Sequence, residues 1–210
     1  MKNIKIFQLI LLITIALSVW NCDDPYDNYI DYAKFEADER ALLERFYNNK
    51  NFMDSLFSLA VVIDSVQVED SKIAIIDTVD HRETSGLLMI RTYKSPQTDS
   101  IKVGHYVGFR YTFWGIVENE NGEPEVHKTP ILSNVTWDDV TSFEIGNRTT
   151  SSYANSGIDE AVRYMFLGDK CTLILPSSIG AQILFSSEMN VALQYTTVIA
   201  DIEVTYWTDR

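Results

Sequence analysis

The pattern of apolar and polar residues is most regular in the C-terminal third of the chain. It first predicts a short amphipathic helix over residues 156–166, followed by a Leu-Gly-Asp turn. Apolar residues at every second position then predict a strand over residues 171–175, which Pro176 ends. A last strand is expected over residues 198–206. The apolar side of the helix consists of Ile158, Ala161, Val162 and Met165.

The N-terminal half predicts one helix and then mostly strands. Asp31 is a suitable cap for a helix that ends near Asn49, with Phe35, Leu42 and Phe46 on one side. Residues 52–64 are apolar without a clear period, so the pattern leaves helix and strand open there. Strands are expected at residues 72–77, 87–93 and 106–117.

The first 21 residues are typical of a secretory signal peptide. Lys2 and Lys5 precede an apolar run that is too short to span a membrane comfortably. Cys22 directly after it resembles the modified residue of a bacterial lipoprotein, which predicts a lipid anchor at this position. The acidic pair Asp23 and Asp24 resembles the surface-export signal of Bacteroidetes-type lipoproteins. The alternative is an ordinary signal peptide followed by a chance cysteine.

The charge of the chain limits its partners. It has 17 basic and 30 acidic residues, and its formal net charge is −13. Loss of the leader removes Lys2 and Lys5 and no acid, which leaves about −15. This charge argues against nucleic acid and against anionic membrane surfaces as electrostatic partners.

Neither a disulfide framework nor a metal or cofactor site is expected. Cys22 and Cys171 are the only cysteines, so a lipidated Cys22 leaves Cys171 without a partner. His81, His105 and His127 are scattered without the spacing of metal ligands. There is also no glycine-rich phosphate-binding loop.

Several short motifs between residues 85 and 207 occur in an order that resembles FKBP-type peptidyl-prolyl cis-trans isomerases. The resemblance implies an α+β fold in which a small antiparallel sheet wraps around one short helix, here with a helical extension before it. The motifs are Ser85-Gly86-Leu87, Val103-Gly104 with Val107–Thr112, Ser142–Gly146, the helix, turn and strand of Gly157–Pro176, and Asp201-Ile202-Glu203-Val204.

The expected organisation therefore has four parts. Residues 1–21 are the signal peptide and residues 22–30 a lipidated tether. Residues 31–84 form the helical extension and a lead-in strand. Residues 85–210 form the FKBP-like domain.

The resemblance also indicates where a prolyl-binding pocket would lie. An isomerase lowers a barrier of ~18–20 kcal/mol without a nucleophile or a metal, because a dry apolar pocket favours the twisted amide. Tyr111 matches a pocket tyrosine of the family. Several other positions carry aliphatic residues in place of rings, and the wall aspartate is missing. The pocket candidates are Tyr111, Ile131, Leu132, Phe143, Ile158, Ala181 and Ala200. Phe113, Trp114, Trp137 and Phe166 are candidates to refill the space.

Three functions follow from these observations. The first is an FKBP-type isomerase-like envelope lipoprotein that assists the folding of exported proteins. The second is a catalytically inert binding module, which the replaced pocket residues favour. The third is a structural subunit of a surface assembly. The expected partners are proline-containing polypeptides or an envelope protein, with the membrane reached only through the lipid.

Overall fold

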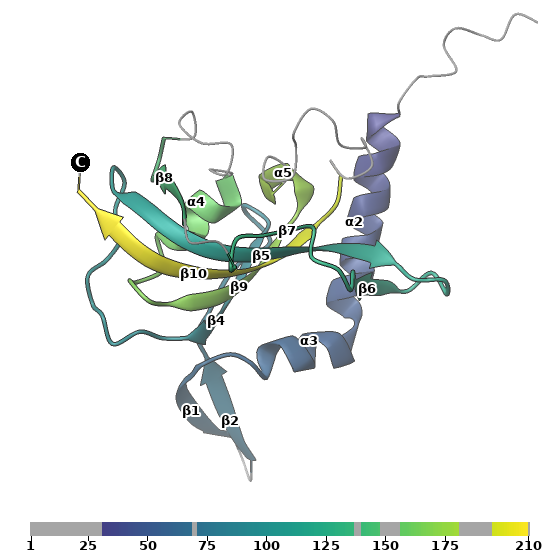
Figure 1. Cartoon of the computed structure of the whole chain (residues 1–210). Helices are drawn as coiled ribbons and strands as arrows, with labels where there is room; N and C mark the ends of the chain where they lie inside the picture. Colours follow the sequence, from purple (N-terminus) through teal and green to yellow (C-terminus); the bar gives the residue numbers. More distant parts are fainter. Residues whose placement is uncertain (1–30, 69–70, 137–139, 148–155, 181–194, 210) are drawn as a thin grey trace, which may run out of the picture. The chain divides into compact units, whose positions relative to one another are not determined.

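The computed structural model describes residues 31–68, 71–136, 140–147, 156–180 and 195–209. The chain divides into two compact units, residues 1–34 and 35–210. In the first unit, the Asp31 side chain accepts a hydrogen bond from the backbone of Lys34 (3.1 Å), which caps the start of the first helix. The second unit is an α+β structure with a large antiparallel sheet (Figure 1).

The helices and strands follow one another along the chain as labelled in Figure 1. The helices are α2 (Tyr32–Asn48), α3 (Lys50–Phe57), α4 (Ser156–Val162) and α5 (Ser177–Gly180). The strands are β1 (Val62–Val68), β2 (Ser71–Ile76), β3 (Thr78–His81), β4 (Leu87–Tyr93), β5 (Tyr106–Glu118), β6 (Pro124–Val126), β7 (Leu132–Ser133), β8 (Thr141–Glu144), β9 (Lys170–Leu175) and β10 (Val198–Thr208).

The large sheet has the strand order β3-β4-β9-β10-β5-β6, and β7 and β8 also pair with β5. All of these pairs are antiparallel. The C-terminal strand β10 therefore lies between β9 and β5, with Ala200 opposite Leu173 on one side and Phe113 on the other. The expected boundary at residue 85 falls between β3 and β4, which are two paired strands of this sheet.

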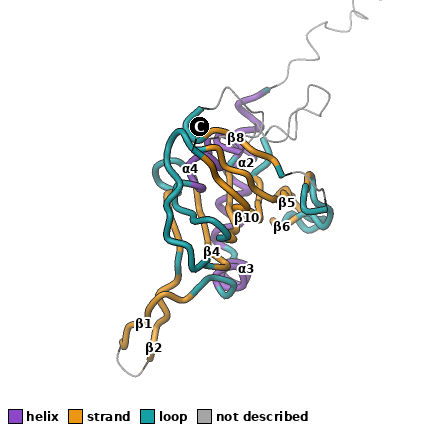
Figure 2. Tube along the Cα trace, turned by 60° about the vertical axis from the view of Figure 1, so that its left-hand side comes forward, coloured by secondary structure: helices purple, strands orange, loops and turns teal. Residues whose placement is uncertain are grey.

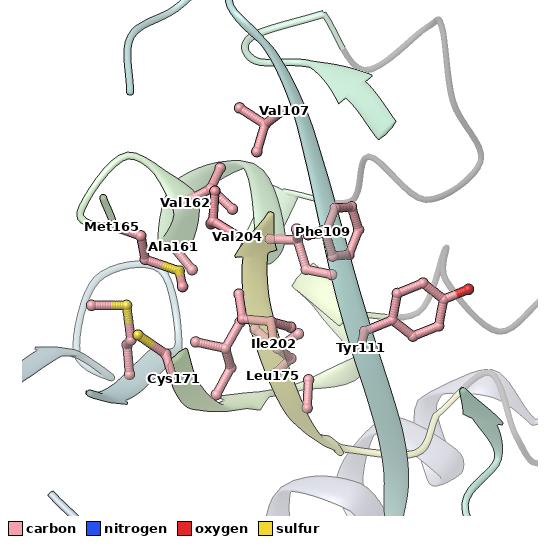
Figure 3. Packing of buried hydrophobic residues seen from close by; sticks show 14 of the residues in the cluster. Val107, Phe109, Tyr111, Ala161, Val162, Met165, Cys171, Leu175, Ile202 and Val204 are labelled. Atoms are coloured by element: carbon pink, nitrogen blue, oxygen red, sulfur yellow. The ribbon is translucent and has the colours of Figure 1, made fainter. Parts of the chain in front are cut away.

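One face of the sheet, called here the α4 face, is formed by alternate residues of β4, β5, β9 and β10. The side chains of α4 point into this face, where Ile158, Ala161 and Val162 are fully buried. In Figure 3, Ala161 and Val162 lie against side chains from β5, β9 and β10. The prediction that the apolar side of this helix lies in the core is therefore confirmed.

The helix ends at Val162, four residues before the predicted end. The next backbone N–H groups bond three residues back in tight turns, and the N–H of Phe166 donates to the buried carboxylate of Asp169 (2.9 Å). Gly168 then adopts a positive φ of 85° in the turn before β9. The carboxylate thus takes a donor that a longer helix would have used.

The opposite face of the sheet is partly covered by α2 and α3. Phe46, Met53 and Leu56 form a second core with Leu88, Ile90, Ile116, Ile174 and Ile199 of the strands. Glu39 of α2 fixes the helix by accepting hydrogen bonds from the backbone of Ser177 (2.7 Å) and the hydroxyl of Thr197 (2.8 Å). The predicted helix from Asp31 is confirmed as α2, and the ambiguous stretch 52–64 contains the end of α3 and the start of β1.

Strands β1 and β2 form a separate hairpin, visible in Figure 2 as a ribbon that extends from the large sheet. The predicted strand at residues 72–77 is β2. Val66 lies opposite Ile73, and both are about half exposed. The hairpin therefore has an apolar surface that the described residues leave open.

Candidate functional site

Most of the predicted pocket residues that the structure describes are buried in the core, and Tyr111 also borders the groove described below. Tyr111, Phe143, Ile158 and Ala200 are each at most 1 % exposed and belong to the core cluster on the α4 face. Ile131 and Leu132 are half-buried and pack against the same cluster. Ala181 and the predicted lipidation site Cys22 lie outside the described residues.

Aromatic rings fill the space around Tyr111. The Phe113 ring stacks on the Tyr111 ring with centroids 4.4 Å apart, and the Phe109 ring lies 5.5 Å from it. Phe109 also meets Phe143 edge-on at 5.5 Å. Of the four refilling candidates, Phe113 is therefore the one that stacks on Tyr111.

The other refilling candidates lie elsewhere. Trp114 pairs with Ile199 and, one residue after Phe113 on β5, is on the opposite face of the sheet. The guanidinium carbon of Arg91 lies over the Phe166 ring, 5.9 Å from the centroid of that ring. Trp137 is outside the described residues.

A buried ionic network joins the ends of the central strands. Arg91 pairs with Asp77 (2.8 Å) and Asp169 (3.3 Å). Asp169 is fully buried and also accepts hydrogen bonds from the backbone N–H groups of Ser95 (2.7 Å) and Phe166. Because the charges are paired and hydrogen-bonded, the network explains the Leu-Gly-Asp turn structurally.

Two potential nucleophiles in the described region lack activation. Burial raises the pKa of the Cys171 thiol to about 12, so Cys171 stays protonated at neutral pH. The hydroxyl of Ser85 donates to Glu160 (3.0 Å), and His81 contacts the same carboxylate oxygen (2.7 Å). The Ser85 hydroxyl therefore donates its hydrogen bond to Glu160, whereas a nucleophile–base pair would need it to donate to the imidazole.

An open groove of about 530 Å³ lies on the opposite face of the sheet, beside the part covered by α2 and α3. Its floor consists of two rows of paired residues. The first row runs Thr112, Asp201, Thr172 across β5, β10 and β9, and the second runs Arg110, Glu203, Lys170 across the same strands. Paired residues in antiparallel strands share a face, so all six side chains start from the groove floor.

The two carboxylates of the floor have different neighbours. Glu203 forms an ion pair with Lys170 (3.4 Å) and has Arg110 as its other cross-strand neighbour. Asp201 lies between two threonines and accepts a hydrogen bond from the hydroxyl of Thr172 (2.6 Å). Burial raises the pKa of the Asp201 carboxyl, and this hydrogen bond opposes the rise. Thr172 is buried, whereas Asp201 is reachable from solvent at the floor.

Sequence reasoning missed this groove. The pairs that form its rows come from strands up to about a hundred residues apart, and only the register brings them together. The local signal was a polar residue at every second position of a strand, as at Asp201 and Glu203, which any solvent-facing strand also shows.

The described residues contain no cluster of three or more histidine, cysteine or acidic residues that could hold a metal ion. In the same part of the chain, no helix is both long enough and apolar enough to cross a membrane.

Comparison with known proteins found no match: no family model and no curated protein matches this chain.

Proposed function

We propose that the chain is a lipid-anchored protein of the bacterial cell envelope whose FKBP-like domain binds an extended polypeptide segment of an envelope protein without isomerising prolyl bonds. The FKBP-like part of the proposal is supported by the motif order and by an antiparallel sheet that holds the short helix α4 in its core. The anchor is inferred from Cys22 after the apolar leader.

The lack of catalysis rests on one observation, the burial of the described pocket candidates. A prolyl ring must enter a pocket to gain from its dry walls. Tyr111, Phe143 and Ile158 instead contact other core residues and have at most 1 % of their surface exposed. A packed core cannot accept a ring without opening, and opening costs stability.

A protease-free prolyl isomerisation assay with the purified full chain in detergent tests this part. We expect a rate equal to the uncatalysed background with peptides that vary the residue before proline. A tenfold change in rate corresponds to ~1.4 kcal/mol, so even a partial pocket would be detected. A catalytic efficiency comparable to that of FKBP enzymes would contradict the proposal.

Binding of an extended polypeptide is tested separately, with an array of peptides of varied charge and proline content. We expect a subset of peptides to bind without any acceleration of isomerisation. If no peptide binds, the binding function is wrong and a purely structural role becomes the better explanation.

The anchor is tested by Cys22→Ala, which should move the chain from the membrane fraction to the soluble fraction. Cys171→Ala is the matched control, because the buried Cys171 is not available for lipidation. A Cys22→Ala chain that remains with the membranes to the same extent as the wild type would show that another segment anchors it.

A further inference from the structure

Strands β2 and β3 form one nearly continuous strand, interrupted at Asp77. The backbone N–H of Asp77 donates to the carbonyl of Val61, which precedes β1 (2.8 Å), and its carbonyl accepts from the N–H of Arg91 of β4 (3.0 Å). The N–H and C=O of one strand residue point to the same side of the strand. Strands β1 and β4 therefore occupy the same edge of this long strand, one after the other.

The opposite edge of the long strand is open. β3 is the last strand of the large sheet, and β1 is the one described strand that pairs with β2. Residues 71–81 span roughly 35 Å in an extended strand. Backbone groups point to alternate sides, so the residues next to Asp77 and every second residue beyond them direct their N–H and C=O groups outward. These outward residues are Lys72, Ala74, Ile76, Thr78 and Asp80.

Such an edge favours pairing with a further strand. Long open edges are uncommon in natural sheets, because they pair with other chains. The hairpin part of the edge has a second reason, since an isolated two-stranded hairpin is marginally stable in water and a third strand supports it. Ile73 and Ile75 are 53 % and 39 % exposed there. They lie on one side of the strand with the partly buried Val79, so this side is aliphatic.

The residues of the open edge are complementary to themselves. When two copies of the strand run antiparallel with Ile76 on the two-fold axis, outward residues face outward residues, as the hydrogen bonding requires. Opposite charges then face each other, and no like charges do. The facing pairs are Lys72 with Asp80, Ile73 with Val79, Ala74 with Thr78 and Ile75 with Asp77, and the two-fold axis repeats each of them.

We propose that the open edge of β2 and β3 binds the same edge of a second copy of this chain, in antiparallel register about Ile76. The sheets of the two copies then join in a symmetric dimer, the commonest kind of oligomer. The inference goes beyond the proposed function and does not depend on it.

The surroundings of Lys72 and Asp80 support this pairing. Lys72 is exposed and forms no ion pair with a described residue. Asp80 is exposed beside an open hollow of about 810 Å³ between α2 and the turn after β3. The hollow has space for the Lys72 ammonium of the second copy, although Asp80 also pairs with Arg82 (2.6 Å). Its charged lining consists of Glu44, Asp80, Glu83, Arg40 and Arg82, an excess of one acid.

The net charge of −13 opposes the approach of a second copy. At physiological ionic strength this repulsion is largely screened beyond about 8 Å, whereas the facing residues of paired strands are in contact. The local pairs therefore decide the association.

The test is sedimentation equilibrium of the full chain in density-matched detergent, where we expect a monomer–dimer equilibrium. Lys72→Glu places acids opposite each other at both ends of the contact, and Asp80→Lys places lysines there. Each should weaken the dimer at least about tenfold, or ~1.4 kcal/mol. The charge swap Lys72→Glu/Asp80→Lys restores opposite charges and should recover the wild-type affinity to within about threefold, or ~0.7 kcal/mol. Lys102→Glu is the matched control, because this exposed lysine before β5 gives the same change in net charge. It should change the affinity by less than about threefold.

Residue-resolved hydrogen exchange locates the contact. The Ile76 amide points outward, so it should be protected in the dimer and exchange faster on dilution. The Val79 amide points toward β4, and its exchange should not depend on concentration.

The inference is wrong if the chain is a monomer at every concentration, if the charge swap binds as weakly as the single variants, or if Ile76 exchange is independent of concentration. A monomer whose Ile76 amide becomes protected on addition of a peptide would assign the edge to another polypeptide and also reject the second copy.

Discussion

The two faces of the large sheet are built from the same strands but are completed differently. On the α4 face, residues of β4, β5, β9 and β10 are buried along nearly their whole length by one short helix and their own rings. On the opposite face, α2 and α3 cover one end, and the other end is the open groove around Asp201. Both faces contribute a core to the fold, and the second also leaves an open groove.

Strand β9 shows this difference within six residues. From Cys171 to Leu175 every residue is buried, although Cys171 and Thr172 border the groove, whereas Lys170 is exposed in it. Thr172 lies at the transition, because its side chain is buried but its hydroxyl reaches Asp201 on the groove floor. A change at the buried end of β9 should therefore affect folding more than a change at Lys170.

The largest effect is expected from Val162→Asp on the α4 face. Val162 is fully buried among apolar side chains, so the new carboxylate would be desolvated without a partner. We expect a loss of roughly 4–5 kcal/mol in the free energy of unfolding, a large share of the stability of a typical domain. Denaturant unfolding monitored by tryptophan fluorescence measures this loss.

Val103→Asp is the control for this substitution. Val103 is 66 % exposed, so the same chemical change should cost no more than about 0.5 kcal/mol. Equal effects of the two substitutions would show that α4 does not lie in the core, and the FKBP-like assignment would fail with it.

Phe46→Ala tests the covered end of the opposite face. Phe46 is 1 % exposed and packs with Phe52 at a centroid distance of 4.4 Å and with the strand residues beneath α2. Loss of the ring should cost about 3–4 kcal/mol and leave a cavity. Unfolding should remain a single transition, because α2 and the sheet share this core. A separate early transition in the wild type would instead show that α2 and α3 unfold independently of the sheet.

The contrast between the faces also explains what the sequence could predict. The helical spacing of Ile158, Ala161 and Val162 was enough to place α4 in the core, because a short helix with one apolar side needs a single partner surface. The apolar side of α2 was also visible, but not its partner. The unbroken apolar run from Leu87 to Ile90 is typical of a strand covered on both faces, and it was the available sign that a second layer exists.

The candidate site could be predicted only in part. Matching to the FKBP pattern located Tyr111 and Ala200 on neighbouring strands, but it contained no information on burial, which depends on how neighbouring rings such as Phe113 fill the space. The groove could not be predicted, because a polar residue becomes significant only beside its cross-strand neighbours. Asp201 and Glu203 look alike in the sequence, and the register alone gives one of them a cation.

Thr172→Val changes a residue at the boundary between the core and the groove. We expect a moderate loss of stability. The valine keeps the shape of the buried side chain but removes the hydroxyl that donates to Asp201. Loss of a hydrogen bond to a partly solvated carboxylate should cost about 1 kcal/mol at neutral pH. A double-mutant cycle with Asp201→Asn measures the coupling between the two side chains. Strictly additive free energies would mean that the hydrogen bond does not contribute.

Asp201→Asn should have the smallest effect on stability. Unlike the core substitutions, it should slightly stabilise the protein near neutral pH. Because the folded-state pKa of Asp201 is raised, the stability that the protonated acid provides is complete below about pH 3.8, the ordinary value, and is lost as the pH rises through the higher folded value. Asparagine does not titrate, so the variant should match the wild type in acid and have a slightly higher Tm near neutral pH. Thermal unfolding of both proteins across this pH range measures the difference. Glu203→Gln should show no such gain, because it removes the partner of Lys170. A wild type that is the more stable protein at neutral pH would mean that the charged Asp201 supports the fold and that burial does not raise its pKa.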